Sequence, residues 1–154
     1  MVDSLEAWWT QRKPELSAIR TLVINSDNGP ECSSRRTQYL QRLVEFADKT
    51  GLVIRLVYCP PSHSKYNSIE RFFGRAWRNL LDSEETVLKR ASNFVWKGNR
   101  AIVTTMTEAY EKGVKLAANQ IHELEARLQR STTLKWWDIT ISPKKYFEKR
   151  IISK

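Results

Sequence analysis

The chain has 154 residues, of which 41% are hydrophobic, and it carries a formal net charge of +9 at pH 7. This length favours one domain, and the apolar content is high enough to build a core, which argues against a disordered protein. No segment approaches the roughly 18–20 continuous apolar residues of a membrane span. The N-terminus also lacks the basic-then-apolar pattern of a secretion signal. We therefore expect a soluble intracellular protein without a membrane partner.

The positive charge is concentrated in the second half of the chain. Arg71–Lys154 contains seventeen Lys and Arg against nine Asp and Glu, whereas Met1–Glu70 is nearly neutral. Phosphate contacts from Lys and Arg supply sequence-independent affinity for nucleic acid. A basic surface can also serve solubility alone, so charge by itself leaves these two interpretations open.

The chain begins with a predicted short amphipathic helix over residues 3–12. Leu5, Trp8 and Trp9 are expected on one face of this helix. Asp3 suits its N-terminal cap or first turn, because acids are favourable at helix N-termini. The six tryptophans of the chain are more typical of core packing than of base stacking.

Strands and helices then alternate up to residue 81. Leu22–Ile24 is a continuous β-prone run, typical of a strand buried on both faces. Residues 35–49 have helical periodicity and end at Gly51, after which Leu52–Tyr58 predicts a second strand. Residues 67–81 predict another helix. Such alternation indicates two parallel strands joined by a right-handed crossover, with flanking helices, in an α/β fold.

Beyond residue 82 the pattern predicts an all-helical, basic C-terminal region. We therefore divide the chain into residues 1–81 and 82–154, and expect a first short helix over 84–96. A heptad-like stripe follows, which favours packing within the chain over an oligomer seam. The stripe consists of Val103, Met106, Tyr110, Val114, Ala117, Ile121, Leu124 and Leu128.

Two acids stand out by their positions after the predicted strands. The run Leu22–Ile24 leads into Asp27 at an Asp-Asn-Gly turn, and the second strand leads through Pro60-Pro61 to Glu70 on a helix. A carboxylate at a strand end and one on a nearby helix form a fixed, convergent pair that suits Mg²⁺, which prefers oxygen ligands. The alternatives are an ordinary turn residue at Asp27 and a surface acid at Glu70, paired with Arg71 or Arg75.

At these residues the chain resembles the DDE transposases of bacterial insertion sequences, most closely the ISAzo-like group. The family's second acid lies in a strand-end turn of the form D-(N/G)-G, which Asp27-Asn28-Gly29 matches. Its third acid lies in the motif P-P-x-x-S-K-x-N-x-I-E, which is long and specific. That motif is matched here by Pro60, Pro61, Ser64, Lys65, Asn67, Ile69 and Glu70.

The resemblance implies a partial RNase H-like core and metal-dependent DNA cleavage and strand transfer. Asp27 and Glu70 would be catalytic ligands of Mg²⁺ or Mn²⁺, and the partner would be DNA, both the insertion-sequence ends and the target. The protein would act in the bacterial cytoplasm, associated with the nucleoid.

Basic residues near both motifs are candidates for binding DNA. Lys65 is placed to contact the phosphate of the cleaved strand as a point charge, and Arg71 follows Glu70 directly. Arg35 and Arg36 are candidates for backbone contacts near Asp27. They are equally explained as the solvated start of a helix.

The family also needs a first catalytic Asp on an earlier strand, and this chain does not provide one. Only Asp3 precedes Asp27, and Asp3 lies in a predicted helix. We therefore expect a transposase fragment whose first strands and first acid belong upstream of Met1, and which is inactive alone. Two further hypotheses remain, a non-catalytic partner that binds DNA or pairs with full-length transposase, and a pseudogene remnant.

Overall fold

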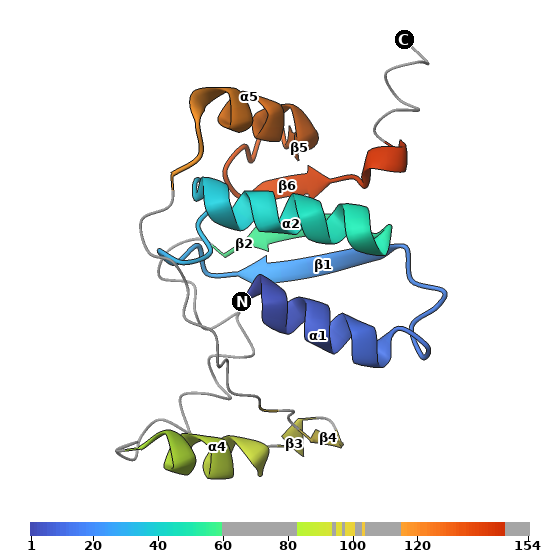
Figure 1. Cartoon of the computed structure of the whole chain (residues 1–154), viewed down its shortest axis with the longest axis vertical. Helices are drawn as coiled ribbons and strands as arrows, with labels where there is room; N and C mark the ends of the chain where they lie inside the picture. The colour runs from blue at the N-terminus through green and yellow to red at the C-terminus, as the bar shows by residue number, and fades with distance from the viewer. Residues whose placement is uncertain (60–82, 94, 97, 101–102, 104–114, 147–154) are drawn as a thin grey trace. The chain divides into compact units, whose positions relative to one another are not determined.

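The computed structural model describes residues 1–59, 83–93, 95–96, 98–100, 103 and 115–146 (Figure 1). The chain forms two compact units, of which the larger comprises Met1–His63 with Val114–Lys154 and the smaller Ser64–Gly113. The larger unit contains three helices and one four-stranded sheet within the described residues. Its elements are α1 (Val2–Arg12), β1 (Thr21–Ser26), α2 (Thr37–Thr50), β2 (Val53–Tyr58), α5 (Ala118–Arg127), β5 (Leu128–Arg130) and β6 (Asp138–Ile141).

The four strands of the larger unit form one mixed sheet in the order β1-β2-β6-β5. Strands β1 and β2 are parallel, with Ser26 opposite Tyr58, as the alternation of elements predicts. Strand β6 is antiparallel to both of its neighbours, β2 and β5. The expected α/β fold with two parallel strands is therefore confirmed.

Helix α2 supplies the centre of the core. Its apolar residues recur at three- and four-residue spacing and lie on one face, where Leu40, Leu43, Phe46 and Ala47 are fully buried. The helix ends as predicted at Gly51, which adopts the left-handed conformation (φ 75°) and donates its N–H to the carbonyl of Ala47. Figure 1 shows α2 lying across the sheet.

The two faces of the sheet differ in polarity. Alternate residues of β2 and β6, among them Leu56 and Ile139, are buried in the same core cluster as residues of α1, α2 and α5. The residues between them point to the opposite face, where the guanidinium of Arg55 lies 2.7 Å from the carboxylate of Asp138. This ion pair holds the pKa of Asp138 below its usual range.

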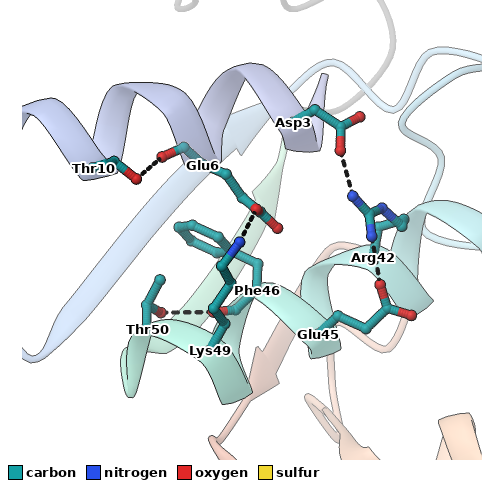
Figure 2. A network of polar contacts seen from close by, with 8 residues as sticks. All are labelled: Asp3, Glu6, Thr10, Arg42, Glu45, Phe46, Lys49 and Thr50. Carbon is teal, nitrogen blue, oxygen red and sulfur yellow. Dashed lines mark hydrogen bonds and ion pairs between the residues drawn. The ribbon is translucent and has the colours of Figure 1, made fainter. Parts of the chain in front are cut away.

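A polar network joins α1 to α2 above the apolar contacts (Figure 2). Arg42 donates to Asp3 in the first turn of α1 and also to Glu45, one turn along its own helix. The ammonium of Lys49 lies 2.6 Å from the carboxylate of Glu6. Asp3 therefore occupies the first-turn position that the sequence predicts and serves as an ion-pair partner between helices.

Two expectations about burial in the first half are wrong. Strand β1 is not buried on both faces, since the side chain of Val23 is 51% exposed. The reason is that the helices of the described residues cover one face of the sheet. Trp8 does not share the buried face of α1, because Trp9 is buried whereas Trp8 is 36% exposed.

The expectation of an all-helical region after residue 82 is also wrong. Helix α5 ends at Arg127, and the chain continues directly into β5 and then β6, which complete the sheet begun by β1 and β2. Only the later part of the predicted heptad-like stripe is in a described helix. There Leu124 is buried, whereas Ile121 is 36% exposed and Leu128 is already in a strand.

The smaller unit contains one helix and a short hairpin within its described residues. Helix α4 spans Glu84–Ser92, and the strands β3 (Val95–Trp96) and β4 (Asn99–Arg100) pair in antiparallel fashion. Ser83 caps the helix, since its hydroxyl accepts the N–H of Thr86 at 3.2 Å. The predicted helix over 84–96 is thus confirmed up to residue 92.

We expect Phe46→Ala to lower the free energy of unfolding by about 3–5 kcal/mol, because the side chain is fully buried and its removal leaves a cavity. Chemical denaturation followed by circular dichroism measures the change. The matched control is Glu45→Ala, one residue earlier on the exposed side of α2, which should cost at most about 1 kcal/mol. Equal effects of the two substitutions would contradict this account of the core.

Candidate metal and nucleic-acid site

Asp27 lies at the end of the sheet that is formed by the carboxyl ends of the two parallel strands, and "edge" refers to this end in the description of the site. It follows Ser26 directly, and the register of β1 and β2 places Ser26 beside Tyr58. The N–H of Cys59 donates to the carbonyl of Ser26 at 2.8 Å, so the pairing extends one residue beyond β2. The carboxyl end of a parallel sheet is where α/β proteins commonly bind ligands.

The turn after β1 fixes the direction of the Asp27 carboxylate. Its Oδ1 accepts the N–H of Gly29 at 3.1 Å, an Asx turn. Asn28 adopts a left-handed conformation (φ 62°), and its side-chain oxygen accepts the N–H of Ser34 at 2.9 Å. A Cβ at Gly29 would lie 3.2 Å from Oδ1 of Asp27, so glycine keeps the turn tight.

Cys32 makes a second contact with the same carboxylate oxygen. Its thiol lies 3.5 Å from Oδ1 of Asp27, and it accepts the hydroxyl of Ser26 at 3.0 Å. Both contacts of Asp27 within the described residues thus go to Oδ1. No sequence motif indicates this role of Cys32, because the contact depends on how the loop folds back.

The chemistry of Asp27 fits a divalent cation, although one acid does not make a metal site. An exposed carboxylate, whose Oδ2 has no hydrogen-bond partner among the described residues, is a suitable ligand for Mg²⁺ or Mn²⁺. Among the residues that the structure describes, no group of three or more His, Cys, Asp or Glu side chains is gathered to hold a metal ion.

Arg35 and Arg36 both lie in the loop that leads from Asp27 to α2. Arg36 donates to the carbonyl of Pro30 at 3.1 Å and forms an ion pair with Glu31 at 3.4 Å. The guanidinium of Arg35 lies 4.7 Å from the ring centroid of Trp136. Both side chains are exposed, and they immediately precede the first residue of α2.

Three cations from the described residues lie close to the half-buried indole of Trp136. Besides Arg35, the guanidinium of Arg130 lies 4.8 Å and the ammonium of Lys135 lies 5.1 Å from the ring centroid. These are distances at which cations are attracted to an indole ring. Arg130 is only 9% exposed, and it donates to the carboxylate of Glu125 at 2.7 Å and to the carbonyl of Ser34 at 3.2 Å.

The tertiary structure brings this cluster to the same edge of the sheet as Asp27. Trp136 lies in the β5–β6 connection, and its neighbour Trp137 accepts the N–H of Tyr58 at 2.8 Å. Sequence analysis missed Arg130, Lys135 and Trp136. The local signal was the Lys-Trp-Trp run, but its significance depends on pairing with residues almost a hundred positions earlier.

The remaining predicted site residues lie outside the described residues. These are Lys65, Glu70 and Arg71, together with the helix expected over 67–81. Of the predicted residues that the structure describes, Asp27, Arg35 and Arg36 lie in one loop at the carboxyl end of β1.

An α/β unit with a mixed four-stranded sheet and an acid at the end of a parallel strand is consistent with a DDE-type domain of the RNase H-like class. The model of the Rhodopirellula transposase DDE domain family matches residues 1–143, so the chain belongs to this family of DDE transposases. Membership implies DNA cleavage and transfer in transposition, with DNA as the partner and divalent metal ions as cofactors.

Other comparisons add no further relatives. Neither the curated proteins nor the solved structures include a match to this chain. None of the helices in the described part of the chain is long and apolar enough to cross a membrane.

We expect Glu125→Gln to lower the free energy of unfolding near neutral pH. The difference in this free energy between the variant and the wild type should become smaller in acid. The Arg130 guanidinium holds the pKa of Glu125 below its usual range. A depressed folded-state pKa stabilises the protein above the unfolded-state pKa, about 4.3, and this stability is lost as the pH falls through the folded value. Urea unfolding of the wild type and of Glu125→Gln at a series of pH values from neutral to acid measures how this difference decreases.

The matched control is Glu123→Gln on the same helix, because the exposed Glu123 forms no ion pair with another described residue. Glu123→Gln should lower the free energy of unfolding less than Glu125→Gln does at neutral pH, because it removes no ion pair of this kind. A Glu125→Gln difference that stays constant down to pH about 3 would contradict the stabilising role of the ion pair.

Proposed function

We propose that Asp27 and Glu70 are two of the carboxylate ligands in the metal-dependent active site of an insertion-sequence transposase. The observation that carries the proposal is the position of Asp27 at the carboxyl end of β1, within a chain that the family model matches over residues 1–143. The turn holds its carboxylate through Oδ1, and Oδ2, which has no hydrogen-bond partner among the described residues, would bind the metal ion.

The position of β2 supports the assignment of Glu70 to the same site. Strand β2 ends beside β1, and the chain leaves it at Cys59, whose N–H is bonded to Ser26. The motif that carries Glu70 begins in the sequence at Pro60, the residue after Cys59. Bound Mg²⁺ or Mn²⁺ would supply stabilisation of the oxygens that attack and leave phosphorus. The chain's own carboxylates would fix the position of that charge relative to the DNA strand.

The first carboxylate of such a site is not supplied by Asp3. That residue is in α1 and forms an ion pair with Arg42 of α2, within the helical layer. We therefore propose that a polypeptide segment outside residues 1–154, or a second chain, contributes the first acid. Residues 1–154 alone would then bind DNA without cleaving it.

A second candidate function is a non-catalytic partner of intact transposase. Strand β1 pairs with β2 on one edge, while within the described residues its other edge is unpaired and Val23 is 51% exposed. An unpaired strand edge can accept a strand from another chain. Co-purification with an intact transposase of the same element at micromolar concentration would support this function, and the absence of association would count against it.

We expect the 154-residue chain to leave supercoiled plasmid DNA intact in the presence of Mg²⁺ or Mn²⁺, because its metal site lacks one principal ligand. Agarose gel electrophoresis of the plasmid over time measures nicking. Nicking by the purified chain that disappears on Glu70→Ala would refute the proposed inactivity. Nicking that survives this substitution would point to a contaminating nuclease.

We also expect Asp27→Asn to weaken the binding of Mn²⁺ to the chain by at least about tenfold, since it removes a charged oxygen ligand. Electron paramagnetic resonance of free Mn²⁺ during titration gives the affinity without requiring activity. The control is Glu45→Gln, an acid on the exposed side of α2, which should leave the affinity unchanged. Equal affinities of the wild type and Asp27→Asn would exclude Asp27 as a ligand.

A further inference from the structure

The cations around Trp136 come from segments that are distant in sequence. Arg35 belongs to the loop after β1, Arg130 is the last residue of β5, and Lys135 lies in the β5–β6 connection. The pairing of β2 with β1 and with β6 brings these segments to one edge of the sheet. The assembly is therefore a product of the whole larger unit.

The charges in this cluster are unequally balanced. Arg130 is neutralised by Glu125, with which it forms two hydrogen bonds of 2.7 and 3.0 Å. Neither Arg35 nor Lys135 forms an ion pair with another described residue, and both are exposed. Arg35 and Lys135 both lie within 5.1 Å of the centroid of one indole ring. An anion bound beside this ring would therefore be attracted by two cations.

The cluster is also connected to the turn that carries Asp27. Ser34 accepts from Arg130 through its carbonyl and donates its N–H to Asn28, the residue after Asp27. Helix α2 begins just beyond, at Thr37, with no acid in its first turn. Its N-terminus adds partial positive charge to this edge.

We propose that Arg35 and Lys135, held against the indole of Trp136, form a binding site for the phosphodiester backbone of a DNA strand beside Asp27. Arg130 is a positioning residue, since it is buried and ties the β5 end to the Asp27 loop through Ser34. The inference rests on the proposed function, because that function makes DNA the anion present at this edge. It assigns the contact to residues from both ends of the chain.

The test is the salt dependence of DNA binding, measured by fluorescence anisotropy with a labelled duplex, the full chain and no divalent metal. Each phosphate neutralised by a protein cation contributes about −0.9 to the slope of log K against log salt. Arg35→Gln and Lys135→Gln should each reduce the magnitude of the slope by about one. Both side chains are exposed, so the folded structure should tolerate these substitutions.

The matched controls remove one positive charge each at the opposite end of the sheet. Lys13 and Arg20 lie between α1 and the start of β1 and are also exposed. Lys13→Gln and Arg20→Gln should leave the slope unchanged. If they reduce it as much as the Arg35 and Lys135 variants do, binding is diffuse and the proposed site is wrong.

The role of the indole is tested separately. Trp136→Leu removes the ring and should weaken binding, while Trp136→Phe keeps an aromatic face and should restore part of the lost affinity. A purely structural role for Trp136 predicts no such partial rescue once both variants are shown to be folded by circular dichroism. Equal affinity of the Leu and Phe variants would refute the proposed role of the ring.

The outcomes also separate this inference from the function on which it rests. A wild-type chain that binds DNA with a salt-dependent affinity, together with unchanged slopes for Arg35→Gln and Lys135→Gln, overturns the site and leaves the proposed function in place. A wild-type chain that does not bind DNA at all overturns both.

Discussion

The structure depends on strand β2, which hydrogen-bonds β1 in parallel on one edge and β6 in antiparallel fashion on the other. This pairing aligns the carboxyl ends of β1 and β2 with the start of β6 and the end of β5. The carboxyl ends of β1 and β2 therefore lie at the same end of the sheet as the connection between residues 130 and 138. The helices hold the sheet from one side, where Leu56 of β2 and Phe46 of α2 are fully buried in the same cluster.

The chemistry at that end of the sheet has two parts that differ in how they are held. Asp27 is fixed by short-range contacts, an Asx turn to Gly29 and the thiol of Cys32. The cationic part depends on long-range contacts, because Arg35 and Lys135 share the indole of Trp136 only when β6 is paired with β2. A transposase domain needs both kinds of group, since carboxylates hold metal ions and cations hold the DNA backbone. The mixed sheet provides a common framework for them.

The ion pairs of the larger unit serve assembly as well as charge balance. Arg127 of α5 lies 2.7 Å from Asp48 of α2, and Asp48 also accepts the N–H of Lys144 beyond β6. Asp3 and Arg42 connect α1 to α2 in the same way (Figure 2). These contacts join segments from both ends of the chain around α2. The C-terminal segment is thus an integral part of the sheet unit, and strands β5 and β6 lie within residues 1–143, which the family model matches.

The sequence by itself determined the elements of the first half, because local signals were strong there. The apolar spacing in α2, its glycine stop at Gly51 and the β-prone run of β2 all led to confirmed elements. The motifs around Asp27 and Glu70 together indicated the family, which the family model confirms. Whether Glu70 shares a site with Asp27 remains a prediction.

Only the tertiary structure determined that the C-terminal segment forms strands. Strands β5 and β6 have three and four residues, too short for periodicity to distinguish them from a helical pattern. They form because β2 offers an unpaired edge and because Ile139 and Ile141 become buried in the core above it. The cluster at Trp136 follows from the same pairing. Such contacts between residues far apart in sequence leave no local pattern. The cluster at Trp136 is therefore evident only from the tertiary structure.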